Sequence, residues 1–280
     1  MKITATLIPS KEDFELKKIS TTELPLSVSK VKTFDDCKLK YKYSYIEKLP
    51  RKEWAHFKFG KLLHDTLEHF HIALINDPHQ DIRALMVSCF ANSRKEYQSD
   101  KEQNKEAWDI LKNYISKMEA DKPETKINVL SVEKEFYIDI GGKVLLNGFI
   151  DRIQVDPDGI LHVADYKTTK NKKYLKDYFQ LLTYAFVLML EDPNIQHIRT
   201  SYILLRHNFE YTTKEFSRPE VMKVSEKFID YAEKILSEQL WRPSPTRLCG
   251  YCDFLDSCED GRRYLEKIGA SKPQFGFSQW

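Results

Sequence analysis

Residues 148 to 170 read GFIDRIQVDPDGILHVADYKTTK, and this stretch decides the fold. Two apolar segments flank the tetrapeptide Asp-Pro-Asp-Gly at 156–159, which is typical of a three-residue hairpin loop. The proline and the second aspartate fit a type I turn, and Gly159 fits the left-handed position of a G1 bulge. We therefore expect a β-hairpin that is closed by Asp156 opposite Ile160.

Two acidic residues fall on one face of this predicted hairpin. The register places Asp151 opposite Asp165, with Cβ atoms about 4.5 to 5.5 Å apart, and Lys167 further along the same face. Carboxylates this close repel each other, so one takes up a proton unless a cation lies between them. A divalent metal ion would satisfy both, and Lys167 could then hold a hydroxide nucleophile or stabilise negative charge in the transition state.

An exposed ladder of salt bridges is the alternative interpretation of these three residues, because such ladders are common on antiparallel strands. The segment from Ile160 to Ala164 is apolar on both faces, as in a central strand, and charges at its end indicate a functional crevice. At this point the residues leave both interpretations open.

The composition is that of a globular chain. Its 280 residues are 41% hydrophobic and 12% aromatic, which is enough for a packed core. The first twenty residues contain no apolar signal segment, and the longest apolar run, Tyr184 to Leu190, is too short to span a bilayer. We therefore expect a cytoplasmic protein. The net charge is only +2, but residues 38–61 hold eight Lys or Arg against two Glu, and residues 165–176 hold five Lys.

Helical periodicity dominates the first half of the chain, and strand periodicity follows it. The predicted elements are a helix that begins at Ser27 or Ser29, bends near 35–37 and runs toward Tyr45, helices at 56–75, 79–98 and 102–121, strands at 129–138, 143–155 and 160–167, a helix at 174–190, strands at 197–206 and 209–216, and a helix at 218–240. This order predicts an α/β fold with a mixed central β-sheet flanked by helices. We expect a single domain over 1–280 that contains a helical region at 56–121.

Four sequence elements, in order, carry a family resemblance. They are FGKLLH at 59–64, GFID at 148–151, DYKT at 165–168, and the spacing Q-x-x-x-Y at 180–184. Together they resemble the PD-(D/E)XK nuclease superfamily, specifically its RecB-type branch. Ile150 stands where the superfamily's name has proline, which the RecB-type branch often lacks. The resemblance implies a restriction-endonuclease-like core.

The resemblance also implies roles for the residues at the end of the hairpin. Asp151 and Asp165 would bind one or two Mg²⁺ or Mn²⁺ ions, and Lys167 would position or activate the attacking water. The main-chain carbonyl of Tyr166 could complete the coordination. His64 on the upstream helix would be a further metal ligand and would favour Mn²⁺.

The other residues of the resemblance have alternative interpretations. Gln180 and Tyr184 lie one helical turn apart, so they could touch phosphate or brace the site, and core packing is the alternative. Glu133 is a weaker candidate for orienting Lys167 or the metal. Glu68, one turn after the histidine, either supports the ligands or is solvated.

Four of the five cysteines have the pattern of metal ligands rather than of disulfides. Cys249, Cys252 and Cys258 form C-x2-C-x5-C, and Cys37 is the expected fourth ligand. A four-cysteine zinc site is the general interpretation. The remote N-terminal cysteine with a C-terminal trio resembles instead the iron-sulfur members of the family, which include the nuclease domain of AddB helicase-nucleases and the CRISPR-associated exonucleases. That resemblance implies a [4Fe-4S] cluster formed by Cys37 with residues 241–262.

Basic and aromatic residues beside these motifs indicate a nucleic-acid partner. The candidates are Lys40, Lys42 and Tyr43 after the first cysteine, and Lys170, Lys172, Lys173 and Lys176 after the hairpin. Cations neutralise phosphates and rings stack on bases, which is the combination that proteins use for single-stranded DNA. An amphipathic helix with solvated lysines and buried tyrosines is the alternative.

We therefore predict a Mg²⁺- or Mn²⁺-dependent deoxyribonuclease, an exonuclease that cleaves single-stranded ends or flaps with metal-activated water. DNA repair, recombination, phage replication and CRISPR adaptation all use such a module. The alternative is a non-catalytic DNA-binding or scaffolding subunit of a helicase-nuclease or CRISPR adaptation complex. The sequence contains no P-loop motif, so a helicase motor would be a separate chain.

Overall fold

The computed structural model describes residues 3–20, 22–52, 54–97, 100–120, 127–172, 175 and 177–270. These residues form two compact units. The first unit contains the described residues up to position 52, Ile138–Asn147, and those from Ser225 to residue 270; the second contains Trp54–Tyr137 and Gly148–Val224. The single domain expected over 1–280 stays a prediction.

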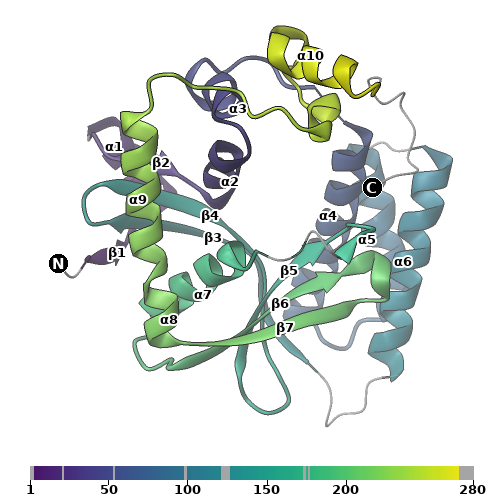
Figure 1. Ribbon diagram of the computed structural model, residues 1–280. Coiled ribbons are helices and arrows are strands. Elements are labelled where there is room, and N and C mark those ends of the chain that lie inside the picture. The colour runs from purple at the N-terminus through teal and green to yellow at the C-terminus, as the bar shows by residue number, and fades with distance from the viewer. Residues whose placement is uncertain are drawn as a thin grey trace. The chain divides into compact units, whose positions relative to one another are not determined.

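The hairpin strands belong to a mixed sheet, as predicted. The strands that matter for the site are β3 (Asn128–Ile140), β4 (Val144–Val155), β5 (Leu161–Lys167), β6 (His197–Leu204) and β7 (Glu210–Ser217), which are neighbours in that order (Figure 1). The pairs β4–β5 and β6–β7 are antiparallel, whereas β5–β6 is parallel. Strand β5 is therefore central, which agrees with its apolar residues on both faces.

The hairpin turn has the predicted geometry. The Asp156 N–H donates to the Ile160 carbonyl at 3.0 Å, the Gly159 N–H donates to the Asp156 carbonyl at 2.8 Å, and Gly159 has a φ of 81°. The observed pairs run from Val155 opposite Leu161 to Arg152 opposite Ala164. One further step of this register brings Asp151 opposite Asp165.

Three helices of the second unit pack on one another beside the sheet strands. They are α4 (Ala55–Asn76), α5 (Ile82–Glu96) and α6 (Lys101–Ala120) (Figure 1). The apolar residues of α4 recur at helical spacing, and most of them are buried: Leu74 is half-buried, whereas the others are at most 1% exposed, namely Phe59, Leu62, Leu63, Leu67 and Phe70. This spacing of three or four residues fixes one face of α4 against the core. His64 lies at one edge of this buried face, where its ring contacts the Tyr166 carbonyl on β5.

Helix α7 (Phe179–Glu191) packs against β5 and β6, and the short helix α8 (Arg218–Met222) follows β7. Helix α7 begins later than the predicted 174, because the Asp177 side chain accepts the Phe179 N–H at 2.8 Å and starts the helix there. Residue 174 lies outside the described residues. The predicted helix 218–240 is wrong in extent: α8 ends at Met222, and α9 (Val224–Ser237) is a separate helix.

The first unit contains the end of β3 and the start of β4. Strand β1 (Ala5–Leu7) pairs with the end of β3, and β2 (Leu24–Leu26) runs parallel to the start of β4. Its helices are α1 (Lys11–Ser20), α2 (Val28–Asp36), α3 (Lys38–Tyr41), a π-helical turn at Lys42–Ile46, most of α9, and α10 (Glu259–Lys267). The bend predicted near 35–37 is confirmed, because Cys37 is extended between α2 and α3. No described helix is both long and apolar enough to cross a membrane.

Candidate metal centre and active site

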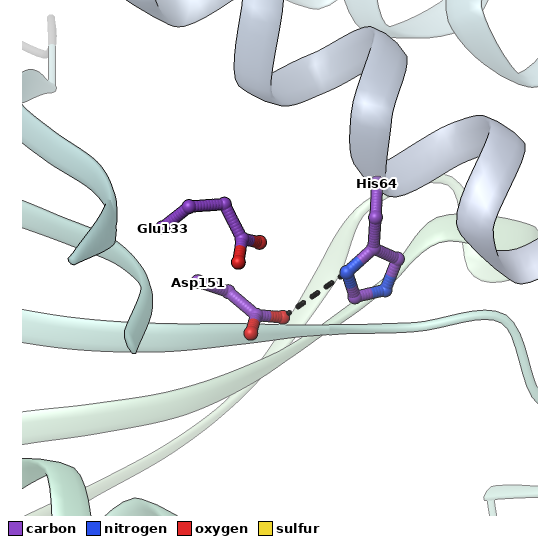
Figure 2. Close-up of side chains that lie close together, drawn as sticks. All are labelled: His64, Glu133 and Asp151. Carbon is purple, nitrogen blue, oxygen red and sulfur yellow. Dashed lines mark ion pairs between the residues drawn. The ribbon is translucent and has the colours of Figure 1, made fainter. Parts of the chain in front are cut away.

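Three side chains from three elements converge in the second unit. His64 comes from α4, Glu133 from β3 and Asp151 from β4, and one ligand atom of each lies within 4.8 Å of the others. Figure 2 shows the imidazole and the two carboxyl groups pointing toward one another. Within the described part of the chain, no other set of three His, Cys, Asp or Glu side chains has this geometry. The set is a candidate metal site.

Both ring nitrogens of His64 have close neighbours. Nε2 lies 3.1 Å from the carbonyl oxygen of Tyr166, and Nδ1 lies 3.4 Å from Oδ2 of Asp151. A carbonyl only accepts hydrogen bonds, so this contact assigns the hydrogen to Nε2 and leaves the Nδ1 lone pair toward the site. Burial lowers the pKa of His64, and Lys167 lowers it further, against the effect of Asp165. The ring is therefore neutral, which is the form that binds metals.

The carboxyl groups of the site are crowded. Burial raises the pKa of Asp151 well above its usual value, and the neighbouring carboxyl groups of Asp165 and Glu133 raise it further. Burial also raises the pKa of Glu133 to about 7, with contributions from Glu68 and Asp165. If both groups were ionised, each would hold its negative charge close to another negative charge. A cation among them would remove that repulsion.

This donor set fits Mg²⁺ or Mn²⁺. Two carboxyl groups and one neutral imidazole supply the oxygen and nitrogen atoms that such ions take, and the histidine favours Mn²⁺ over Mg²⁺. Burial and mutual repulsion raise the pKa values of Asp151 and Glu133. A divalent cation would stabilise the charged form of both carboxyl groups.

A closed ring of polar contacts holds Asp165 and Lys167 in place. Lys167 Nζ lies 2.5 Å from Asp165 Oδ2 and donates to Gln180 Oε1 at 3.1 Å. Gln180 Nε2 donates to the Tyr184 hydroxyl at 2.9 Å, and that hydroxyl donates to Asp165 Oδ1 at 3.2 Å. The ammonium also lies 5.2 Å from the ring centre of Tyr202 on β6. Each member therefore fixes the position of its neighbours.

The spacing in the sequence explains this ring. Residues 165 and 167 share one face of β5 because side chains alternate along a strand. Gln180 and Tyr184 are four residues apart on α7, so they lie one above the other and reach the same place. The acidic residues are well buried, with Asp165 1% exposed and Asp151 8% exposed.

The predicted ligands fall into two groups in the structure. Asp151 lies with His64 and Glu133, whereas Asp165 lies with Lys167. The Tyr166 carbonyl faces His64 Nε2, so coordination of an ion would compete with that hydrogen bond. The ligand and catalytic roles of these residues stay predictions.

The four cysteines of the predicted cluster lie in the first unit and line one cavity of about 150 Å³. Three of the sulfurs accept main-chain N–H groups at 3.3 to 3.5 Å; these are Cys37, Cys249 and Cys258. Hydrogen bonds to sulfur are one way in which proteins tune iron-sulfur clusters. A Cβ on Gly261 would lie 3.3 Å from Cys258 Sγ, so glycine keeps space beside the thiol. The residues fit a thiolate-bound metal group.

The DNA-contact candidates of the first unit lie near this cavity. Lys40 lines the cavity itself, and Lys42 forms an ion pair at 3.1 Å with a glutamate five residues later. The Tyr43 ring packs edge-on against Phe254, and its hydroxyl donates to the Ser257 carbonyl at 3.3 Å. These contacts favour a structural role for Tyr43 over base stacking.

The candidates of the second unit follow β5. Lys170 and Lys172 are exposed, and Lys172 pairs with Glu210. Lys173 and Lys176 lie outside the described residues. The DNA-binding roles of these lysines stay predictions.

Comparison with known proteins assigns the family. The model of the PD-(D/E)XK nuclease superfamily matches residues 25–259 of the 280. This chain belongs to the PD-(D/E)XK nuclease superfamily. The match covers both units, from β2 to the first residue of α10.

Relatives of this superfamily member include much longer proteins. One subunit of the ATP-dependent helicase/deoxyribonuclease from Streptococcus pyogenes serotype M3 is 26% identical over 197 residues, which cover 66% of this chain and 18% of that protein. The serotype M6 protein of the same name is 27% identical over the same coverage. The chain thus spans less than a fifth of the length of these relatives. A crystal structure from Eubacterium rectale named "Putative exonuclease" covers 92% of this chain and 94% of its own, with 12% identity and a TM-score of 0.48.

Glu133 is the candidate ligand that the sequence of this superfamily member indicated only weakly. No motif with fixed spacing links it to Asp151, and only the position of β3 beside β4 brings the two together. An isolated glutamate on a strand is usually solvated, so the sequence offered no signal that distinguished this one.

Proposed function

We propose that this chain is a divalent-metal-dependent deoxyribonuclease that hydrolyses phosphodiester bonds. The observation that supports this most strongly is the convergence of His64, Glu133 and Asp151 in the unit that also holds the Asp165–Lys167 pair. Membership of a nuclease superfamily and the name of the S. pyogenes relatives support hydrolysis and DNA as the substrate.

The residues of the second unit would divide the work. His64, Glu133 and Asp151 would hold the ion, with Asp165 on the neighbouring strand as a further ligand. When bound, the ion lowers the pKa of a water molecule and offsets charge on the phosphate. The Lys167 ammonium would orient the attacking water or meet the negative charge that develops on the phosphate oxygens. Gln180 and Tyr184 would keep Lys167 and Asp165 in the arrangement that this requires.

Cleavage of end-labelled DNA tests this proposal. We expect the wild type to degrade single-stranded DNA in the presence of Mn²⁺ or Mg²⁺, and Asp165→Asn to lose at least about 100-fold in rate, by analogy with loss of one stabilising group in other active sites. Asp158→Asn is the matched control, because Asp158 lies on the same hairpin but is exposed and pairs with Arg199. Equal cleavage by the wild type and Asp165→Asn, or none by either, would contradict the proposal.

We propose single-stranded ends or flaps as the preferred substrate. The exposed Lys170 and Lys172 follow the active-site strand and can neutralise phosphates, a contact that needs no duplex. Parallel assays on labelled single strands, blunt duplexes and flapped duplexes should show faster loss of the first and third. Faster cleavage of the blunt duplex would refute this preference.

The helicase in the relatives' name leads us to propose a partner motor outside these 280 residues.

We propose a [4Fe-4S] cluster for the four cysteines of the first unit. All four cysteines line the same cavity, so their thiols can bind one metal group. Their order along the chain, one remote cysteine before a C-terminal trio, favours a cluster over one zinc ion.

Anaerobic purification distinguishes the two metal groups. The cluster predicts brown protein with broad visible absorbance and with iron and acid-labile sulfide in equal amounts. Colourless protein that carries stoichiometric zinc would favour the four-cysteine zinc site instead. Cys89→Ser is the control, because Cys89 is buried on α5 in the second unit and is not one of the cysteines that line the cavity. Its loss should leave the colour unchanged.

A further inference from the structure

A buried arginine lies directly next to a candidate metal ligand in the chain but on the other side of its strand. Arg152 follows Asp151 on β4 and is 3% exposed. Its Nη1 donates to the Tyr114 hydroxyl at 2.9 Å and to the Tyr166 hydroxyl at 3.3 Å, while its Nε has no hydrogen-bond partner. Among the described residues no carboxylate forms an ion pair with it.

Stability of the fold does not explain why Arg152 is buried. Burying a guanidinium without an anionic partner costs several kcal/mol, and neutral hydroxyl groups compensate only part of that. An apolar side chain of similar volume would serve the core at least as well. The contacts of Arg152 therefore have to be explained by what they hold in place.

The contacts extend from Arg152 to the helix of the metal site. Tyr114 belongs to α6, and its hydroxyl lies 2.7 Å from Nε2 of His71 on α4. His71 comes seven residues, or two helical turns, after His64 on the same helix face. Burial and the nearby Arg152 lower the pKa of His71 well below its usual value, so the neutral ring accepts the Tyr114 hydrogen. Arg152 is thus tied to α4 through two hydrogen bonds in series.

The second arm ends at the main chain of the site. Tyr166 is held by Arg152 through its hydroxyl, while its N–H donates to Asp151 Oδ2 at 3.0 Å and its carbonyl lies 3.1 Å from His64 Nε2. One residue therefore contacts both candidate ligands on one side of the strand and the arginine on the other. Both arms of the network bear on the spacing between His64 and Asp151.

We propose that Arg152 is a positioning residue that sets the His64–Asp151 spacing through Tyr166 and through Tyr114–His71, and so sets the affinity of the acidic site for Mn²⁺. The proposal rests on the proposed function, because it concerns the same metal site. The relevant variants are Tyr166→Phe and Tyr114→Phe, which each remove one hydroxyl and keep the ring in the core. Loss of such an outer contact typically weakens metal binding by about 10- to 100-fold.

Mn²⁺ binding measured by electron paramagnetic resonance, without DNA, tests this role. We expect Tyr166→Phe and Tyr114→Phe to bind Mn²⁺ about tenfold more weakly than the wild type. Tyr231→Phe is the matched control, because Tyr231 is a buried tyrosine of the first unit whose hydroxyl donates to Asp35 rather than accepting from Arg152. Urea titrations of the same proteins separate a loss of stability from a loss of metal affinity in the folded state.

Two outcomes would overturn the proposal: wild-type Mn²⁺ affinity in both variants, or an equal loss in Tyr231→Phe. Cleavage assays on the wild type keep the two claims apart. Weaker Mn²⁺ binding by the variants of a protein that cuts no DNA would support the positioning role and refute the nuclease. Unchanged Mn²⁺ binding by the variants of an active nuclease would refute only the positioning role.

Discussion

Glu133 carries its carboxyl group on an unusual backbone. Its φ of 45° lies in the left-handed region, which costs a non-glycine residue about 1 to 3 kcal/mol. Such conformations are concentrated at functional sites, and this one places the side chain beside His64 and Asp151 (Figure 2). The backbone of Glu133 thus supports its place in the metal site independently of its charge.

Stability of the metal-free protein should depend on pH through Glu133. Its pKa rises from 4.5 to about 7 on folding, so the folded state holds a proton that the unfolded state has released. Stability is therefore fully present below about pH 4.5 and falls as the pH rises to about 7. Asp151, whose pKa is also raised, acts in the same direction. Glu133→Gln cannot titrate, so it should lose less stability between pH 4.5 and pH 8.

Urea unfolding with a chelator present measures this difference. Glu135→Gln is the control, because Glu135 lies on the same strand and is exposed. Equal losses of stability by the wild type and Glu133→Gln over this range would show that Glu133 does not titrate as described. Mn²⁺ should remove most of the wild-type pH dependence by replacing the proton.

Lys167 should affect the reaction rather than the metal. Its ammonium contacts Asp165, Gln180 and the Tyr202 ring but is not a ligand. We expect Lys167→Met to lower the cleavage rate by about 100- to 1,000-fold and to leave Mn²⁺ affinity within a few-fold of the wild type. Single-turnover cleavage and Mn²⁺ titration measure the two effects. Loss of metal binding in this variant would assign Lys167 a structural role instead.

At the scale of single elements, the glycine that opens GFID has a packing reason. A Cβ on Gly148 would lie 2.8 Å from Cζ of Phe136, a buried ring on the neighbouring strand β3. We expect Gly148→Ala to destabilise the protein by about 1 to 3 kcal/mol, the usual cost of overpacking a core. The second change Phe136→Leu should recover part of that loss. Thermal unfolding of both variants checks this, and a neutral Gly148→Ala would contradict the close contact.

The elements differ in how far the sequence predicts them. The hairpin register followed from the turn chemistry of Gly159 and its neighbours, because a G1 bulge permits one pairing. Strands β1 and β2 have three residues each, too few to show a period of two. The apolar pattern predicted that the helix begins at 174. The side chain of Asp177, which accepts the Phe179 N–H, was the better indicator of where α7 begins. We find no feature of the sequence around Lys223 that explains the break between α8 and α9.

At the scale of the whole molecule, the two candidate metal groups belong to different units. The acidic site lies in the second unit and the four cysteines lie in the first. We therefore expect Cys37→Ser to lose the colour of the cluster while Mn²⁺ binds the acidic site with wild-type affinity. Mn²⁺ titration of anaerobically purified protein measures this. A parallel loss of Mn²⁺ affinity would show that the cysteines support the acidic site.

The sequence predicted the residues of the site better than their grouping. Alternation along β5 predicted that Asp165 and Lys167 share a face, and the four-residue step on α7 predicted that Gln180 and Tyr184 point the same way. The contacts between the two pairs became visible only in the structure. The partnership of His64 with Glu133 depends on how α4 and β3 pack in three dimensions, and no local pattern encodes that. The same holds for Arg152, whose burial becomes visible only in the folded chain.

Anomalous diffraction from crystals soaked in Mn²⁺ tests the central claim most directly. We predict an anomalous peak, measured at the manganese absorption edge, within bonding distance of His64, Glu133 and Asp151. The peak should be lost in Asp151→Asn crystals. A peak elsewhere in the second unit, or none at these three side chains in otherwise well-ordered crystals, would contradict the claim that this acidic site binds the divalent ion.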